Sequence, residues 1–127
     1  MGFEVSVMKF EGPLDLLLNL IHENQMDIFD LDMSVLTDQY IEYLHKMEKM
    51  DIEVESEYLV ELSRLIEIKS QKMLPKPEIE GDEYEEDPRE RLVKRLLEYQ
   101  RYKEVTKTLY DTFSERQLQL SKPLSVE

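Results

Sequence analysis

Apolar residues recur at spacings of three and four along most of the chain, which is the pattern of amphipathic α-helices. Such segments lie at residues 13–24, 33–47, 56–73 and 88–121. Ahead of the first one, Phe3, Val5 and Val7 alternate with polar residues, which predicts a short extended segment. The pattern therefore predicts an all-α fold: a small bundle of three amphipathic helices, a long C-terminal helix and a short extended N-terminal segment.

Start and stop signals set the expected helix boundaries. Pro13 suits the first position of the first helix, and Asp32 or Ser34 caps the second. The third helix ends before Pro75, since proline cannot continue a helix. The long helix has the strongest start signal. Asp87 can cap it, Pro88 suits its first position, and Glu90 can be the acidic member of a capping box.

An acidic segment separates the third helix from the fourth. Residues 78–87 carry like charges around a glycine and have too little apolar surface to order, so we expect a flexible linker. The predicted domains are an N-terminal helical domain at 1–77, this linker, and a long helix with its tail at 88–127. At 1.5 Å per residue the long helix measures roughly 45–50 Å, which exceeds the width of the bundle, so part of it should project.

The third helical segment offers two faces. The residues expected to pack on the first two helices fall on one side roughly 120° wide: Tyr58, Leu59, Leu62, Leu65, Ile66 and Met73. A second, mixed stripe has no obvious cover within so small a core: Val60, Arg64, Ile68 and Gln71. The alternative is that the first helix or the N-terminal extended segment covers this stripe.

Composition narrows the class of protein. The chain has 127 residues and a net charge of −13, with 29 acidic and 16 basic side chains, which argues against nonspecific binding of nucleic acid. It contains no cysteine, which excludes disulfides, thiolate nucleophiles and zinc knuckles. No apolar run approaches the roughly 20 residues that cross a bilayer, and no signal peptide is evident, so we expect a cytoplasmic protein without membrane contacts.

Catalytic and metal-binding motifs are also missing from the sequence. There is no phosphate-binding loop, nucleophile elbow or zinc-binding helix motif. His22 and His45 fall on separate helices, where we interpret both as ordinary surface residues. The segment with Asp27, Asp30 and Asp32 lacks the glycine and the terminal glutamate of a calcium-binding loop. We therefore interpret these residues as part of a connecting segment and a helix cap. We expect no enzymatic activity, cofactor, metal ion or small-molecule substrate.

The long helix has a locally basic composition. The cations that make this pattern are Arg89, Arg91, Lys94, Arg95, Arg101, Lys103 and Lys107. One hypothesis is a stand-alone nucleic-acid-binding module in which these cations contact phosphates while Tyr99 and Tyr102 stack on bases. The other is that ion pairs along the helix, such as Glu90 with Lys94, make it soluble. The acidic segment upstream favours the second interpretation.

Several motifs occur in a specific order along the chain. Residues 10–18 read FEGPLDLLL, residues 68–70 read IKS, residues 87–90 read DPRE and residues 97–99 read LEY. In this order the motifs resemble the N-terminal and central regions of the segregation and condensation protein A (ScpA) family, the bacterial kleisins. The resemblance covers nearly the whole chain but not the C-terminal winged-helix domain of that family.

The resemblance implies a non-enzymatic linker subunit of the SMC–ScpA–ScpB condensin complex. In this family the N-terminal helical domain binds the coiled-coil neck of an SMC subunit, and the central region binds a ScpB dimer. The resulting ring entraps and compacts chromosomal DNA, so contact with DNA is expected only through the complex, at the nucleoid. Without the winged-helix domain, no second contact with an SMC head is expected.

The resemblance and the apolar pattern together suggest two sets of binding residues. The residues expected to bind the SMC neck are Val60, Arg64, Ile68 and Gln71. Those expected to bind ScpB are Tyr99, Tyr102, Leu109 and Phe113. For the second set the alternative is that the long helix folds back on the N-terminal domain as a fourth bundle helix.

Overall fold

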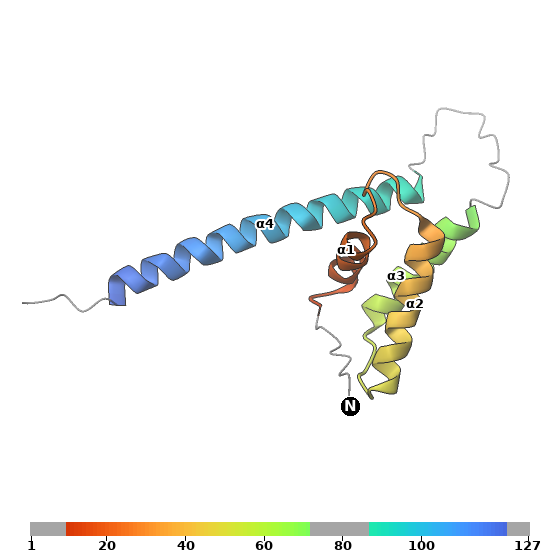
Figure 1. Ribbon diagram of the computed structural model, residues 1–127, viewed down its shortest axis with the longest axis horizontal. Helices are drawn as coiled ribbons and strands as arrows, with labels where there is room; N and C mark the ends of the chain where they lie inside the picture. The colour runs from red at the N-terminus through yellow and green to blue at the C-terminus, as the bar shows by residue number, and fades with distance from the viewer. Residues whose placement is uncertain (1–9, 72–86, 122–127) are drawn as a thin grey trace, which may run out of the picture.

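The computed structural model describes residues 10–71 and 87–121, and every regular element in them is a helix. The four helices are α1 (Pro13–Glu23), α2 (Met33–Lys49), α3 (Ser56–Gln71) and α4 (Pro88–Ser121). The first three cluster under the N-terminal end of α4, and the rest of α4 extends away from them (Figure 1). The prediction of an all-α fold is confirmed. The predicted extended segment around Phe3, Val5 and Val7 and nearly all of the acidic segment lie outside the described residues.

Helix α1 is the centre of the core. Pro13 occupies its first turn as predicted, and Asp15 accepts a hydrogen bond from the backbone N–H of Glu11 at 3.0 Å, which closes the helix start. The apolar side chains buried around this short helix are Leu16, Leu17, Leu18, Leu20 and Ile21. Such burial on several sides requires neighbours on several sides, and α2, α3 and α4 all pack against α1.

Helix α2 is amphipathic, as the spacing of apolar residues at 33–47 predicted. Asp32 is its cap and accepts a hydrogen bond from the backbone N–H of Val35 at 3.2 Å. Its buried apolar residues are Met33, Leu36, Tyr40, Leu44 and Met47. The Tyr40 hydroxyl donates to the Tyr58 carbonyl of α3 at 2.7 Å, and burial raises its pKa above the ordinary value. This buried hydrogen bond fixes α2 and α3 side by side.

Helices α1 and α2 end in the same way without glycine. Gln25 and Asp51 follow the two helices with φ of 54° and 57°, in the left-handed region. After each, the next backbone N–H bonds back into the last helical turn, from Met26 to Ile21 at 3.0 Å and from Ile52 to Met47 at 2.9 Å. This is the Schellman motif, which usually carries glycine at the left-handed position. The sequence therefore gave no signal for these two turns.

Helix α3 is rotated relative to the expected orientation. Its buried residues are Tyr58, Glu61, Leu65 and Ile68, whereas Leu59 and Ile66 are 53% and 45% exposed. The predicted core face was thus wrong for Leu59 and Ile66, by a rotation of roughly 80° about the helix axis. The physical reason is that α3 also packs on α4, which draws the Glu61 and Ile68 side of the helix inward.

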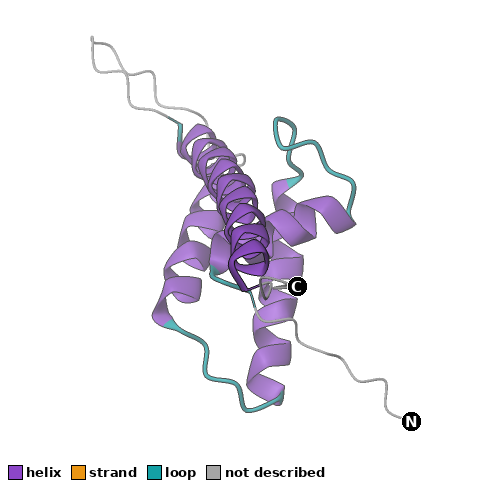
Figure 2. Ribbon diagram, turned by 90° about the vertical axis from the view of Figure 1, so that its left-hand side faces the viewer, coloured by secondary structure: helices purple, strands orange, loops and turns teal. Residues whose placement is uncertain are grey.

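Helix α4 has two parts. Its first turns pack on α1 and α3, with Leu92 and Leu96 completely buried, while the side chains of residues 101–113 are all exposed. Helix α4 therefore begins as a fourth bundle helix, as one alternative predicted, and then projects. Figure 2, viewed nearly along α4, shows the helix crossing in front of the bundle. The division into domains at 1–77 and 88–127 stays a prediction.

Replacing Thr37 by valine should stabilise the protein. Thr37 is 1% exposed, and in the part of the chain that the structure describes its hydroxyl is the one buried side-chain polar atom without a hydrogen-bond partner. Removing an unsatisfied hydroxyl should raise the free energy of unfolding by about 1 kcal/mol, measured by urea denaturation. The same change at exposed Thr112 should have little effect; a loss of stability in Thr37→Val would contradict the assignment.

Candidate interaction surfaces

The docked part of α4 is held by apolar and polar contacts on one side of the helix. Leu92 and Leu96 insert into the core formed by α1, α2 and α3. At the start of the helix the Arg89 guanidinium donates to the Leu31 carbonyl at 2.8 Å. Further along, Arg95 contacts α3, and Lys103 contacts α1. These positions recur every three or four residues, so one face of α4 makes all the contacts.

A buried ion pair joins α3 to α4. The Glu61 carboxylate is 2% exposed, and both of its oxygens accept from Arg95 Nη1, at 2.9 and 3.0 Å. Arg64 lies one turn along α3 from Glu61, with its Nη1 at 3.4 Å from the same carboxylate. A buried carboxylate needs such partners because the loss of hydration would otherwise be prohibitive. The pair therefore defines how α4 meets α3.

Two polar contacts attach α4 to the start of α1. The Tyr99 hydroxyl donates to the Glu11 carboxylate at 2.6 Å, and Lys103 Nζ lies 2.6 Å from Asp15 Oδ1. Burial, and then the hydrogen bond to Glu11, raise the pKa of Tyr99 above its ordinary value. Asp15 thus has two roles, since it closes the start of α1 and also holds α4. Beyond Lys103, α4 leaves the bundle.

The uncovered side of α3 combines apolar and small residues. We call this surface the α3 face and define it by Leu59, Val60, Ser63, Ile66 and Ser70, all exposed. The Ser63 hydroxyl donates to the Val60 carbonyl at 2.8 Å, so it is satisfied within the helix. Serines between aliphatic side chains let another helix approach closely. The α3 face is suited to packing against a helix.

The residues predicted to bind SMC divide between this surface and the core. Val60 is 50% exposed, and Arg64 and Gln71 are also exposed. Ile68 is 4% exposed, so the expectation that the whole stripe lacks cover was wrong at that position. The start of α4 supplies part of the cover, since Ile68 and Pro88 line the same groove. Sequence reasoning missed Leu59 and Ile66 as surface residues, because it assigned them to the core.

The projecting part of α4 carries a second apolar surface. We call it the α4 arm stripe, and its residues are Tyr102, Val105, Leu109, Tyr110 and Phe113. Their exposed fractions lie between 52% and 70%. Of the residues predicted to bind ScpB, Tyr102, Leu109 and Phe113 belong to this stripe. Tyr99 differs, because it is half-buried and packs against the core beside Tyr102, with ring centroids 6.1 Å apart.

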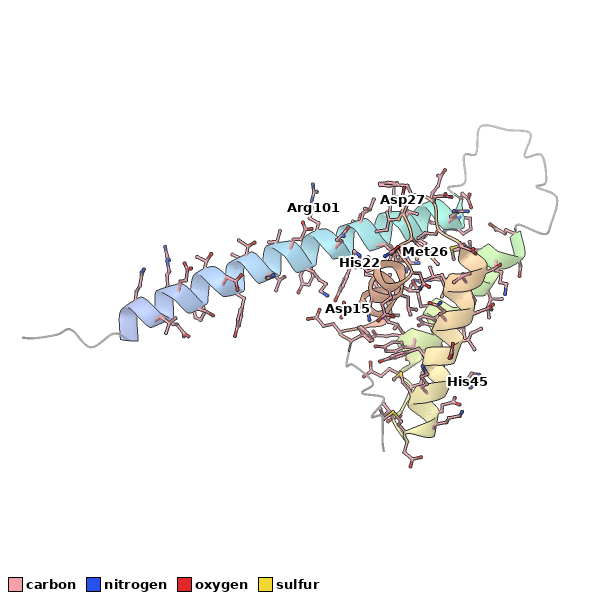
Figure 3. All side chains as sticks on the ribbon, in the orientation of Figure 1. Asp15, His22, Met26, Asp27, His45 and Arg101 are labelled. Carbon is pink, nitrogen blue, oxygen red and sulfur yellow. The ribbon has the colours of Figure 1, made fainter. Side chains whose placement is uncertain are left out.

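Residues 10–71 and 87–121 contain no group of three or more histidine, cysteine, aspartate or glutamate residues placed to hold a metal ion. His22 and His45 are exposed on separate helices (Figure 3). In the same ranges, no helix is both long enough and apolar enough to cross a membrane. The prominent features of the structure are therefore its two apolar surfaces.

A helical bundle that keeps two apolar helix faces in solvent is typical of protein-binding subunits. The family model for segregation and condensation protein ScpA matches residues 20–127. The chain therefore belongs to the ScpA family, as the sequence motifs predicted.

Curated relatives support this membership. The chain is 50% identical to segregation and condensation protein A of Oceanobacillus iheyensis over 117 residues, covering 90% of this chain and 47% of the relative. It is 50% identical to that of Listeria monocytogenes serotype 4a and 45% identical to that of Bacillus velezensis, each over 127 residues and 97% of the chain. Those matches cover 50% and 51% of the relatives. The chain spans about half the length of the curated relatives it matches.

Removing the Glu61 carboxylate should loosen the contact between α3 and α4. Glu61→Ala leaves Arg95 without its partner and should lower the free energy of unfolding by about 3 kcal/mol, measured by chemical denaturation. Amide hydrogen exchange should increase in the first turns of α4. The matched control is Glu67→Ala, at an exposed position of the same helix, which should change stability by less than about 0.5 kcal/mol. Equal losses in the two variants would contradict a special role for Glu61.

Proposed function

We propose that this chain is part of a non-enzymatic kleisin subunit that bridges the SMC coiled-coil neck and a ScpB dimer in chromosome condensation and segregation. Family membership supports the role in chromosome segregation and condensation. The observation that carries the bridging role is the presence of two separate apolar surfaces, the α3 face on the bundle and the α4 arm stripe beyond it. Such an arrangement suits a subunit that binds two partners at once.

The α3 face is the proposed site for the SMC neck. Its aliphatic residues are on the outside of a helix whose opposite side is fixed in the core by Tyr58 and Leu65. A coiled coil laid on this face would extend the bundle, since helix-on-helix recognition uses apolar ridges with residues spaced by three and four. Val60 and Arg64, which are both exposed, are retained as proposed contact residues for the SMC neck. Ile68 is buried beneath this surface and is not a contact residue.

The α4 arm stripe is the proposed site for ScpB. Aromatic and aliphatic anchors of this kind dominate the energetics of interfaces. Tyr102, Leu109 and Phe113 are retained as contact residues, and Val105 and Tyr110 join them. Tyr99 becomes a positioning residue, because its hydrogen bond to Glu11 helps to hold the base of the arm.

The alternative of a nucleic-acid-binding module has less support. Three of the eight cations on α4 already serve the fold, since Arg89, Arg95 and Lys103 bind groups of the bundle. The remaining cations belong to a chain of net charge −13. Phosphate contacts would have to overcome that charge, so indirect contact with DNA through the complex is the better proposal.

A charge placed on the α3 face should abolish binding of the SMC neck. Leu59→Asp combined with Ile66→Asp puts carboxylates at the centre of the proposed contact and should weaken binding to an SMC head-and-neck fragment by at least about 100-fold, measured by calorimetry. Both side chains are exposed, so the fold should persist.

The control for this experiment is Met50→Asp, which changes an exposed apolar residue at the end of α2. It should bind the SMC fragment like the unmodified protein. Unchanged affinity in the double variant would refute the α3 face as the site. Ile68→Glu is unsuitable here, because it would place a charge in the core.

Shortening one residue of the α4 arm stripe should weaken binding of ScpB. Leu109→Ala removes an anchor and should cost about 1–2 kcal/mol, or roughly 10-fold in affinity for the ScpB dimer. Leu118→Ala is the matched control, since Leu118 is exposed to a similar extent, 67% against 64%, but is on a different side of α4. Surface plasmon resonance with immobilised ScpB compares them. Equal effects of the two changes would argue against the stripe.

A further inference from the structure

One edge of the α4 arm stripe carries opposite charges at its two ends. Arg101 and Glu115 are both exposed, and the 14 positions between them make about four helical turns, so they lie on the same edge. Thr108 lies midway along this edge, and its hydroxyl donates to the Glu104 carbonyl at 3.0 Å. A surface with a cation and an anion at equal distances from its centre is complementary to a copy of itself that runs in the opposite direction.

We propose that the α4 arm stripe pairs with the same stripe of a second copy of this chain, antiparallel, about a two-fold axis near Thr108. Arg101 of each copy then meets Glu115 of the other, once on each side of the axis. The apolar residues of the stripe, such as Leu109 close to the axis, pack between those of the second copy. The inference concerns this chain alone and does not depend on the proposed function.

The difference between the two edges of the stripe determines the orientation. The edge opposite Arg101 and Glu115 carries uncharged Thr106 and Tyr110, and Lys103 beside them is bound to α1. In an antiparallel helix pair the same edge of each copy meets, whereas in a parallel pair each edge meets the other one. A parallel pair would therefore place Arg101 and Glu115 beside uncharged residues. The antiparallel pair gives each cation an anion.

The helical bundles leave room for this pairing. The side chains of residues 101–113 are all exposed, and Arg101 points away from the bundle (Figure 3). Leu96, in the docked part of α4, is 12 positions from Thr108, so the two-fold axis places the two bundles roughly 36 Å apart along the helix pair. A domain of this size is roughly 30 Å in diameter. The two bundles therefore lie beside each other without collision.

The paired region is short, so the dimer should be weak. Residues 101–115 extend over roughly 21 Å, and a contact between two helices of this length belongs to the small, transient interfaces that bury less than about 1,200 Å². Exposed ion pairs add little affinity, but like charges in the same places disfavour the wrong orientation. We expect the dimer to form at concentrations of about 10–300 µM.

Sedimentation velocity of the whole chain tests the dimer. Between about 5 and 500 µM the unmodified chain should change from monomer to dimer. Leu109→Asp places a carboxylate close to the axis in both copies and should abolish the dimer over this range. The matched control is Leu118→Asp, the same change at an exposed leucine on a different side of α4, which should leave the dissociation constant within about twofold. Circular dichroism verifies that each variant is folded.

A charge swap tests the antiparallel orientation. Arg101→Glu and Glu115→Arg each place like charges opposite one another, and each should weaken dimerisation at least about 5-fold. The two changes together restore opposite charges and should return the dissociation constant to within about twofold of the unmodified chain. Within one chain the two residues are roughly 21 Å apart, more than two Debye lengths in 0.15 M salt, so restoration reports contact between copies. Lys107→Glu, on the opposite side of α4, is the control for Arg101→Glu and should have little effect.

Three results would overturn the inference. The first is a chain that stays monomeric at the highest concentration. The second is a dimer that Leu109→Asp does not affect, because the contact then lies elsewhere on the molecule. The third is a pair of single charge reversals that the double variant does not rescue. None of these measurements contains SMC or ScpB, so failure of this inference is separate from failure of the proposed function.

Discussion

The structure depends on the burial of one carboxylate between α3 and α4. Glu61 is almost fully enclosed, and Arg95 of α4 supplies the charge that makes its burial tolerable. A buried carboxylate without a cation would be strongly destabilising, so the contact with Arg95 favours the orientation that α3 adopts against α4. That orientation leaves Leu59 and Ile66 in solvent. The internal ion pair thus determines which side of α3 is offered to other molecules.

Docking of α4 also sets the direction of its projecting part. Leu92 and Leu96 fix the helix in the core, and the contacts of Tyr99 and Lys103 with α1 extend the attachment by two further turns. Exposed ion pairs are weak singly, but here they continue an apolar contact along the same helix face. An α-helix transmits orientation along its length, since all its backbone hydrogen bonds are internal. The two proposed binding surfaces therefore keep a fixed geometry relative to each other.

Sequence periodicity was sufficient to predict the helices and most of the core. The start of α4 at Pro88 and the stripe of α2 around Tyr40 follow directly from caps and spacing. The orientation of α3 was not predictable in the same way, because its apolar residues occupy more than one side. Which side is buried depends on Arg95, which is 34 positions away from Glu61. A pattern within one helix carries no information about a partner so distant in sequence.

The candidate binding residues were also only partly predictable, because a local pattern does not show which residues distant parts of the chain cover. Tyr102, Leu109 and Phe113 are exposed on one side of α4, because nothing in the described residues covers that part of the helix, and their role in binding stays a prediction. Tyr99 continues the same periodicity, but it belongs to the docked part of α4. It packs against the core of the bundle, and its hydroxyl donates a hydrogen bond to the Glu11 carboxylate. The point where packing stops and projection begins is set by the size of the bundle, which is a tertiary property. A local sequence pattern identifies the surface, and the tertiary contacts decide how much of it remains for a partner.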